Sequence, residues 1–405
     1  MRRRVVVTGM GVVSPIGNSV ATFTASLLAG TSGVGPITLF DPATLSTRIA
    51  AEVKWDGPPP VDRKIGFALA AAEQACLDAQ SCGSGPIGDG GLSLGVGLEL
   101  FRMDDLVASR RPGFALPQAL ADRLTFLQTP SDLAVHAISR RHGLRTPPLT
   151  HVSACAAGTD AIGAAFRLIA SGRRRWMLAG GSDSMINPLG VAGFCAVRAT
   201  TTSNAFPARA SRPFDRERNG FVLGEGAGLL VLETLDDARA RGARIAAEVV
   251  GYGNSFDAYG ISEPHPDGRG AYQAMAAALA DAGVDASVVD CINAHGTSTR
   301  KNDPVETAAI KRLLGPRAHA VPVCATKSMI GHLISAAGAV EAIAAIAGMR
   351  AGWAHPTINL DDPDPACDLD YVAHKARRHQ QRYVLSNSFG FGGQNAALVL
   401  KAFDA

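Results

Sequence analysis

The chain has 405 residues, of which 47% are hydrophobic and 19% are charged. This composition excludes an intrinsically disordered protein, and the length excludes a small domain that needs disulfides or a metal to hold its core. Its 39 basic and 36 acidic residues give a net charge of +3, which provides no reason to expect nucleic-acid or membrane-surface binding. At roughly 150 residues per domain, we expect two domains or one large domain built in two halves.

The cysteines and the apolar stretches point to a cytoplasmic protein. Seven cysteines are scattered without a CxxC pair, which argues against a zinc ribbon or a thioredoxin motif. The apolar run after the basic N-terminus is too short for a signal peptide. The longest apolar stretch, around 333–349, is interrupted by Glu341, so we expect no membrane-spanning helix.

The first part of the chain alternates β-branched runs, which predict strands, with alanine-rich stretches, which predict helices. In chain order, strands are predicted at 5–8, 92–96, 149–153, 176–179 and 228–232. Helices are predicted at 65–79, 160–170 and 235–241. The first strand is expected to run into a turn at the glycines of 9–11.

The same pattern starts again near residue 245. Strands are predicted at 245–250, 288–293, 321–325, 383–386 and 396–400, and helices at 270–282, 305–314 and 335–349. The strand 245–250 leads into glycines at 251 and 253, just as the strand 5–8 leads into glycines at 9 and 11. This alternation predicts an α/β protein with buried strands. The restart predicts two related halves, 1–244 and 245–405, and no flexible linker separates them.

Cys155 is a candidate nucleophile. It follows the apolar strand 149–153, and small residues lead from it into the helix 160–170. A thiol at the N-terminal end of a helix meets free N–H groups and the positive end of the helix dipole, which favour the thiolate. The alternative for an isolated cysteine is that it acts only as a small, buried hydrophobic residue. We assign that role to the other six cysteines.

Three further segments carry groups that suit the same chemistry. His295 and the pair Lys327 and His332 each follow a predicted strand, where α/β sheets bind ligands. The loop 386–395 places two phenylalanines among three glycines, which suits a mobile lid with backbone N–H donors. Taken singly, each feature has a plainer explanation: His295 could be a core histidine, Lys327 a surface lysine, and the loop 386–395 a bulged turn. Together with Cys155 they supply a nucleophile, two donors and an oxyanion site.

These segments resemble the β-ketoacyl-[acyl carrier protein] synthases, in particular the type II elongating condensing enzymes. The likeness runs over nearly the whole chain and is densest from about residue 150 onward. It is carried by the stretches SRPFDRERNGFVLGEGAG, NAHGTSTRKNDPVE, TKSMIGHLISAAGAVEA and PTINLDDPDPACDLDYV. The resemblance implies the thiolase-like fold, two related halves in a five-layered α-β-α-β-α arrangement. The resemblance does not decide between an enzyme of fatty-acid synthesis and the ketosynthase subunit of a type II polyketide synthase.

The resemblance also implies a mechanism. Cys155 would take an acyl chain from an acyl carrier protein, and His295 and His332 would stabilise the enolate formed as malonyl-carrier protein loses its carboxylate. Lys327 would orient the two imidazoles. Backbone N–H groups of Cys155 and Phe391 would hold the tetrahedral oxyanion. The reaction lengthens the chain by two carbons and needs no cofactor, because substrates arrive on the phosphopantetheine arm.

Other residues match supporting positions of the family. Glu306 would support Lys327 and the loops, Phe389 and Phe391 would form the gate, and Phe194 would line the acyl pocket. The phosphopantetheine arm would contact Ser262, Thr297 and Thr299. Carrier-protein docking would use Arg63, Lys64 and Arg198. A structural monovalent cation would lie at Asn293, Glu341, Ser386 and Asn387. No catalytic metal is expected, and the partner in a dimer would be an identical chain or a ketosynthase-like paralogue.

Two departures and two alternatives bear on this interpretation. The stretch 95–120 departs from the family where the acyl pocket floor is shaped, so chain-length preference does not carry over. Residues 156–157 are both alanine where the family has a more polar pair. A chain-length factor would lack the cysteine at 155, and a thiolase would need a second cysteine in the loop 386–395, which has none.

Overall fold

The computed structural model describes residues 2–57, 62–80, 85–86, 89–97 and 130–404. Its helices are α1 (Val20–Ala29), α2 (Arg63–Gln80), α5 (Pro130–Arg141), α6 (Ala157–Ala170), α7 (Pro188–Ala196), α8 (Leu235–Ala240), α9 (Arg269–Ala282), α10 (Asn302–Leu314), α11 (Lys327–Ile330) and α12 (Ala337–Ala351). Residues 98–120, which are most of the stretch that departs from the family pattern, lie outside the described residues.

Among the described residues, ten strands form one mixed sheet in the order β10-β9-β13-β14-β8-β1-β7-β6-β4-β5. Their bounds are β1 (Val5–Val13), β4 (Gly91–Val96), β5 (Leu149–His151), β6 (Trp176–Asp183), β7 (Gly226–Thr234), β8 (Ala247–Phe256), β9 (Cys291–Asn293), β10 (Val323–Cys324), β13 (Tyr383–Gly390) and β14 (Gln394–Lys401). Two short ribbons pair β2 (Gly35–Pro36) with β3 (Ile49–Ala50) and β11 (Trp353–Ala354) with β12 (Arg377–Arg378).

The sheet consists of two five-strand groups with the same topology. Counted outward from the centre, β1-β7-β6-β4-β5 and β8-β14-β13-β9-β10 each place their own strands in the chain order 1-5-4-2-3. In both groups the outer three strands are parallel, and the remaining neighbours are antiparallel. The groups join through a three-residue ladder in which Val5 pairs with Val249 and Val7 with Ala247.

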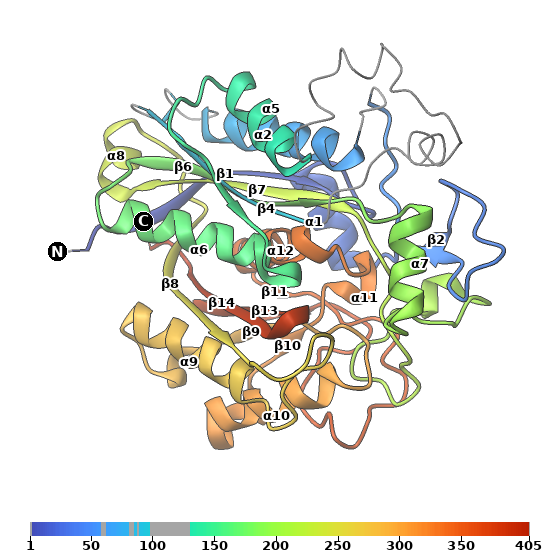
Figure 1. Cartoon of the computed structure of the whole chain (residues 1–405). Coiled ribbons are helices and arrows are strands. Elements are labelled where there is room, and N and C mark those ends of the chain that lie inside the picture. Colours follow the sequence, from blue (N-terminus) through green and yellow to red (C-terminus); the bar gives the residue numbers. More distant parts are fainter. Residues whose placement is uncertain (1, 58–61, 81–84, 87–88, 98–129, 405) are drawn as a thin grey trace, which may run out of the picture.

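Helices separate and cover the two strand groups. Figure 1 shows α2 and α5 on one outer face, α6 and α12 in the middle, and α9 and α10 on the other outer face. The central helix α12 packs against β6 and β7 on one side and against β13 on the other. The five-layered α-β-α-β-α arrangement expected from the resemblance is therefore confirmed.

The glycines that were expected to follow the first predicted strand of each half lie within the observed strands β1 and β8 and form no turn. β1 continues through Gly9 and Gly11, because their missing side chains let α2 lie directly on the strand. A Cβ on Gly9 would lie 2.1 Å from the Ala75 carbonyl oxygen. Gly251 in β8 meets α9 in the same way, since its Cβ would lie 2.2 Å from the Ala278 carbonyl oxygen. These glycines therefore serve helix-on-strand packing.

One helical stretch among the described residues, Ile334–Ala351, is long and apolar enough to cross a membrane by length and composition alone. In the fold 89% of this stretch is buried. It lies with α6 in the middle layer of the protein, and its glutamate, Glu341, is paired there with Lys327. The apolar character of the stretch is therefore explained by its place in the core.

Candidate active site

The strand-to-helix turn expected at Cys155 is confirmed. β5 ends at His151, and a short 3-10 turn (Ala154–Ala156) leads directly into α6. Ala154 adopts a left-handed backbone conformation with φ of 49°, which is costly for a residue with a side chain. This conformation turns the Cys155 sulfur out of the helix and towards the two histidines, while the residue remains only 4% exposed.

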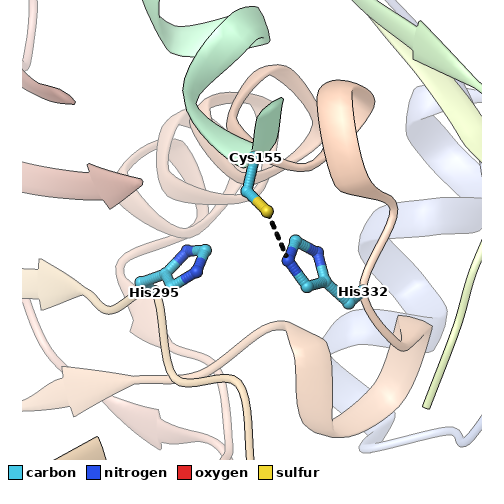
Figure 2. Close-up of side chains that lie close together, drawn as sticks. All are labelled: Cys155, His295 and His332. Atoms are coloured by element: carbon cyan, nitrogen blue, oxygen red, sulfur yellow. Dashed lines mark hydrogen bonds between the residues drawn. The ribbon is translucent and has the colours of Figure 1, made fainter. Parts of the chain in front are cut away.

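His332 contacts the sulfur directly. Its Nε2 lies 3.1 Å from Cys155 Sγ, as Figure 2 shows. Its Nδ1 accepts a hydrogen bond of 3.1 Å from the backbone N–H of Ile334. Because Nδ1 is thus an acceptor, the ring proton of the neutral imidazole is on Nε2, and it points at the reacting sulfur.

Lys327 fixes His295 in the same tautomer. Its ammonium lies 3.2 Å from His295 Nδ1, and it donates to the His295 carbonyl oxygen at 2.7 Å and to the buried carboxylate of Glu341. An ammonium has only donors, so His295 Nδ1 is the acceptor and its Nε2 carries the proton. The rings of His295 and His332 lie 5.3 Å apart at an angle of 84°. Two N–H donors therefore face one space from different directions.

Burial and Lys327 keep both imidazoles neutral. Desolvation is the larger cause and the nearby ammonium the smaller one, and together they hold the pKa of His295 and of His332 well below the usual value. A neutral imidazole at pH 7 can donate a hydrogen bond without carrying charge, which is the state the resemblance implies.

The N–H groups at the helix end favour the thiolate as expected, but burial of the sulfur opposes them more strongly. Burial raises the pKa of Cys155 to about 11. The N–H groups of Phe391 and of Cys155 itself, together with Lys327, lower the pKa, but burial outweighs them. The resting thiol is therefore protonated, and the N–H groups around the sulfur are available to stabilise charge that develops during the reaction.

The site has the spacing of a metal centre. One ligand atom from each of Cys155, His295 and His332 lies within 4.8 Å of the other two. Both Nδ1 atoms accept hydrogen bonds, however, so the Nε2 atoms that face the sulfur present protons. A metal ion would need lone pairs at those positions. The arrangement therefore suits donors to an oxyanion or enolate better than metal ligands.

Of the two buried glutamates, Glu306 supports the histidine loop as expected, but Glu341 takes its place beside Lys327. Glu306 accepts from the backbone N–H groups of His295 and Gly296, both at 2.8 Å, and so holds the histidine loop and makes no ion pair with Lys327. The partner of Lys327 is Glu341, which was expected at a cation site. Burial raises the pKa of Glu306 to about 6.

The aromatic residues expected at the gate and pocket lie beside the nucleophile. Phe389 and Phe391 line the same cleft as Cys155 and the two histidines. Phe194 lies 6.4 Å from Phe391 and 5.5 Å from Phe221, measured between ring centroids. Phe221 in turn packs edge-on against His332, a contact that was not expected from the sequence. Phe391 is followed by two glycines with φ of 77° and 79°, a conformation that permits a sharp loop.

The residues expected to hold the phosphopantetheine arm line this cleft as well. Ser262, Thr297 and Thr299 border it, and the hydroxyls of the two threonines lie 3.0 Å apart. Arg198, an expected docking residue, is exposed at the cleft. Within the lining, Cys155 is the only cysteine that the structure describes, so a second thiol of the thiolase kind is not found there.

The two other expected docking residues are not suited to that role in this chain. Lys64 is only 1% exposed and pairs with Asp62 at 3.6 Å. The guanidinium of Arg63 is mostly buried and pairs with the buried carboxylate of Glu225. Both residues open α2, where Lys64 is buried and Arg63 is partly exposed but already paired with Glu225.

Three of the four expected cation ligands, Asn293, Glu341 and Ser386, are neighbours, whereas the amide of Asn387 donates to Glu306 at 3.2 Å. Asn293 pairs with Ser386 across β9 and β13, and its amide donates to the Glu341 carbonyl oxygen at 2.8 Å. Among the described residues, Glu341 Oε2 and Asn387 Oδ1 are buried oxygens without a hydrogen-bond partner. Each is an oxygen acceptor with unmet capacity, which is the kind of ligand that a hard monovalent cation takes.

Comparison with known proteins identifies the family. Models described as the beta-ketoacyl synthase N-terminal and C-terminal domains match residues 2–238 and 246–361. The chain belongs to the beta-ketoacyl synthase family. It is 43% identical to a 3-oxoacyl-[acyl-carrier-protein] synthase 2 of Synechocystis sp. over 99% of both chains.

Solved structures give the same result for this β-ketoacyl synthase. A type II PKS acyl-carrier protein complexed with its hexaketide-bound ketosynthase has 32% identity and a TM-score of 0.88, over 100% of both chains. The ishigamide ketosynthase/chain length factor has 36% identity and a TM-score of 0.87, over 100% of both chains.

These comparisons establish the reaction. The synthase is an acyltransferase of the elongating, condensing type. It condenses an acyl thioester with malonyl-[acyl carrier protein], with loss of carbon dioxide, and extends the chain by two carbons through an acyl-cysteine intermediate. Its fold is thiolase-like.

Proposed function

We propose that Cys155 is the nucleophile of this condensation and that His295 and His332 drive the decarboxylation. The observation that carries the proposal is the convergence of the sulfur and two imidazole nitrogens within 4.8 Å. In the first step the sulfur attacks the acyl thioester and displaces the carrier's thiol, which takes up the proton of Cys155. The acyl chain then lies against Phe194 and the aromatic gate.

In the second step, the carboxylate of the malonyl group leaves as carbon dioxide. The electrons of the broken carbon–carbon bond move onto the thioester oxygen, and the two Nε2–H groups donate to that oxygen. The resulting carbanion attacks the acyl carbon, and the carbon–sulfur bond to Cys155 breaks. The thiolate that leaves takes up a proton from water, which restores the resting thiol. The backbone N–H groups of Cys155 and Phe391 hold the oxyanion between attack and release. Lys327 keeps the imidazole of His295 neutral and fixed in orientation.

Every group that this chemistry requires comes from the chain or the substrates, so no cofactor is part of the proposal. Glu341 Oε2 and Asn387 Oδ1 would hold a monovalent cation, with Asn293 and Ser386 beside them. When bound, that cation supplies charge balance beneath the catalytic loops.

We place the division between the two halves at 244/245. Residues 1–244 carry the nucleophile, and residues 245–405 carry both histidines and the glycine loop. The identical strand order of the two groups and the separate matches at 2–238 and 246–361 support this division.

We assign acyl carrier protein as the partner and the cytoplasm as the compartment. The cleft supports the first assignment, because Ser262, Thr297 and Thr299 border a path from its mouth to Cys155. Arg198 at the mouth suits an acidic carrier. A homodimer serving fatty-acid synthesis is favoured by the relative from Synechocystis sp.. A heterodimer with a ketosynthase-like paralogue in polyketide synthesis is the second candidate, favoured by the ishigamide ketosynthase/chain length factor.

The test is to locate the acyl group by peptide mass spectrometry after incubation with acyl-[acyl carrier protein]. We expect the added mass on the peptide that contains Cys155, and we expect Cys155→Ala to form neither acyl-enzyme nor elongated product. Cys155→Gln is expected to keep releasing carbon dioxide from malonyl-carrier protein. Cys76→Ala, on α2, is the matched control and should behave like the natural enzyme. Elongation by Cys155→Ala would refute the covalent step.

A further inference from the structure

The turn that carries Cys155 has a counterpart in the second half of the chain. A 3-10 turn (Ile334–Ala336) leads directly into α12, just as the turn at Cys155 leads into α6. The sequences ACAAG at 154–158 and ISAAG at 334–338 align without gaps. Both turns begin with a left-handed residue, with φ of 49° and 47°. Ser335 therefore occupies the position in one half that Cys155 occupies in the other.

The two turns differ in what faces their backbone N–H groups. Asp183 is the last residue of β6 and Gly390 the last of β13, the corresponding strand. The N–H of Ser335 donates to Asp183 Oδ2 at 3.0 Å. A Cβ on Gly390 would lie 3.1 Å from the nitrogen of Cys155. The N–H at the nucleophile is thus left open to substrate, whereas its counterpart is occupied by a carboxylate.

The Ser335 turn also contacts both reacting groups. The Ser335 hydroxyl donates to the Ala154 carbonyl oxygen at 3.3 Å, at the left-handed residue before the nucleophile. The N–H of the preceding residue, Ile334, sets the tautomer of His332. Ser335 and Asp183 are 0% and 1% exposed, so these contacts are shielded from water.

We propose that Ser335 and Asp183 are positioning residues that hold the Cys155 turn and the His332 ring in register for acyl transfer. Asp183 fixes the Ser335 backbone, and Ser335 ties that backbone to the strained peptide at Ala154. A strained turn persists only where its surroundings hold it, and these two residues supply the polar part of that support. The proposal rests on the proposed role of Cys155 as nucleophile.

The charge of Asp183 provides a second, separable signature. It raises the pKa of the Cys155 thiol, in opposition to Lys327, and the neutral His295 and His332 complete the surroundings of the sulfur. The surroundings of Asp183 include Lys64, which lowers its pKa, and Asp62, which raises it. Burial raises the pKa of Asp183 to about 6, so it is charged at pH 7 and above.

The experiment compares Ser335→Ala, Asp183→Asn and a control, Ser93→Ala, in the full-length enzyme. Ser93 is a fully buried serine in β4 that donates to the Ala161 carbonyl oxygen of α6. We measure acylation by acyl-[acyl carrier protein] and the pH dependence of Cys155 alkylation by iodoacetamide, read by peptide mass spectrometry. Alkylation reports the thiol itself, so it remains informative even if Cys155 is not the nucleophile.

We expect Ser335→Ala to slow acylation about tenfold, equivalent to about 1.4 kcal/mol, whereas Ser93→Ala acylates at the natural rate. Asp183→Asn should move the midpoint of alkylation to lower pH, because a negative charge is removed near the sulfur. General damage to the fold would also expose the thiol and lower its pKa, so the midpoints are compared only between variants whose thermal midpoint equals that of the natural enzyme. Natural acylation by Ser335→Ala would overturn the proposal, and so would an unmoved midpoint in Asp183→Asn.

Discussion

The buried pair of Lys327 and Glu341 allows stability and catalysis to be separated by two substitutions. The two residues are 1% and 0% exposed, and the ammonium uses its three N–H groups on His295 and Glu341. Lys327→Met keeps an apolar stem of similar length but leaves the carboxylate without its cation. Breaking such a pair from one side costs about 3–5 kcal/mol of unfolding free energy. We expect a loss in that range in urea denaturation.

The double variant Lys327→Met/Glu341→Gln removes the isolated charge as well. We expect it to recover most of the lost stability, because a buried pair replaced on both sides is close to neutral. Decarboxylation of malonyl-carrier protein should stay at least about tenfold below the natural rate, because His295 has lost the donor that sets its tautomer. Lys311→Met is the control, since that lysine forms an exposed pair with Asp368 and should cost less than about 1 kcal/mol. A double variant that decarboxylates normally would refute the role given to Lys327.

Three further outcomes are expected. His295→Ala and His332→Ala should each lower decarboxylation about 100-fold and acyl transfer less, as measured by release of carbon dioxide and by formation of acyl-enzyme; equal losses would contradict the division of labour. Because burial raises the pKa of Cys155 to about 11, iodoacetamide alkylation should rise about tenfold per unit from pH 7 to pH 10; a plateau at pH 8 would show an ionised thiol. Replacing sodium and potassium by tetramethylammonium should lower the thermal midpoint of the natural enzyme but not of Glu341→Gln; equal shifts would remove Glu341 from the cation site.

Much of the catalytic site could be predicted from the sequence because its groups follow strands. The positions of Cys155, His295 and His332 after strand-like runs are local features, and strands that end at one edge of a sheet bring such residues together. The roles of Glu306 and Glu341 depend on which carboxylate reaches Lys327. That choice is made by packing between residues far apart in the chain, and the sequence holds no signal for it.

Other differences have the same origin in long-range contacts. Gly9 and Gly11 have the composition of a turn, and only the approach of α2 shows that they allow close packing. Lys64 has the composition of a surface residue, and its burial follows from the direction in which α2 faces. The thiol of Cys155 was expected to ionise from its place at a helix end, but the depth of the surrounding fold decides its pKa. The signal for Ser335 was available, since ISAAG repeats the pattern of ACAAG.

The short ladder between β1 and β8 has a consequence for how this enzyme can be divided. The sulfur belongs to one strand group and both imidazoles to the other, and these groups share one continuous sheet through Val5–Val7 and Ala247–Val249. Neither fragment alone can complete a catalytic cycle, whereas two fragments that dock edge to edge would restore one. The relative placement of the sulfur and the imidazoles therefore depends on how the two strand groups are held together, by this ladder and by the helices packed between them.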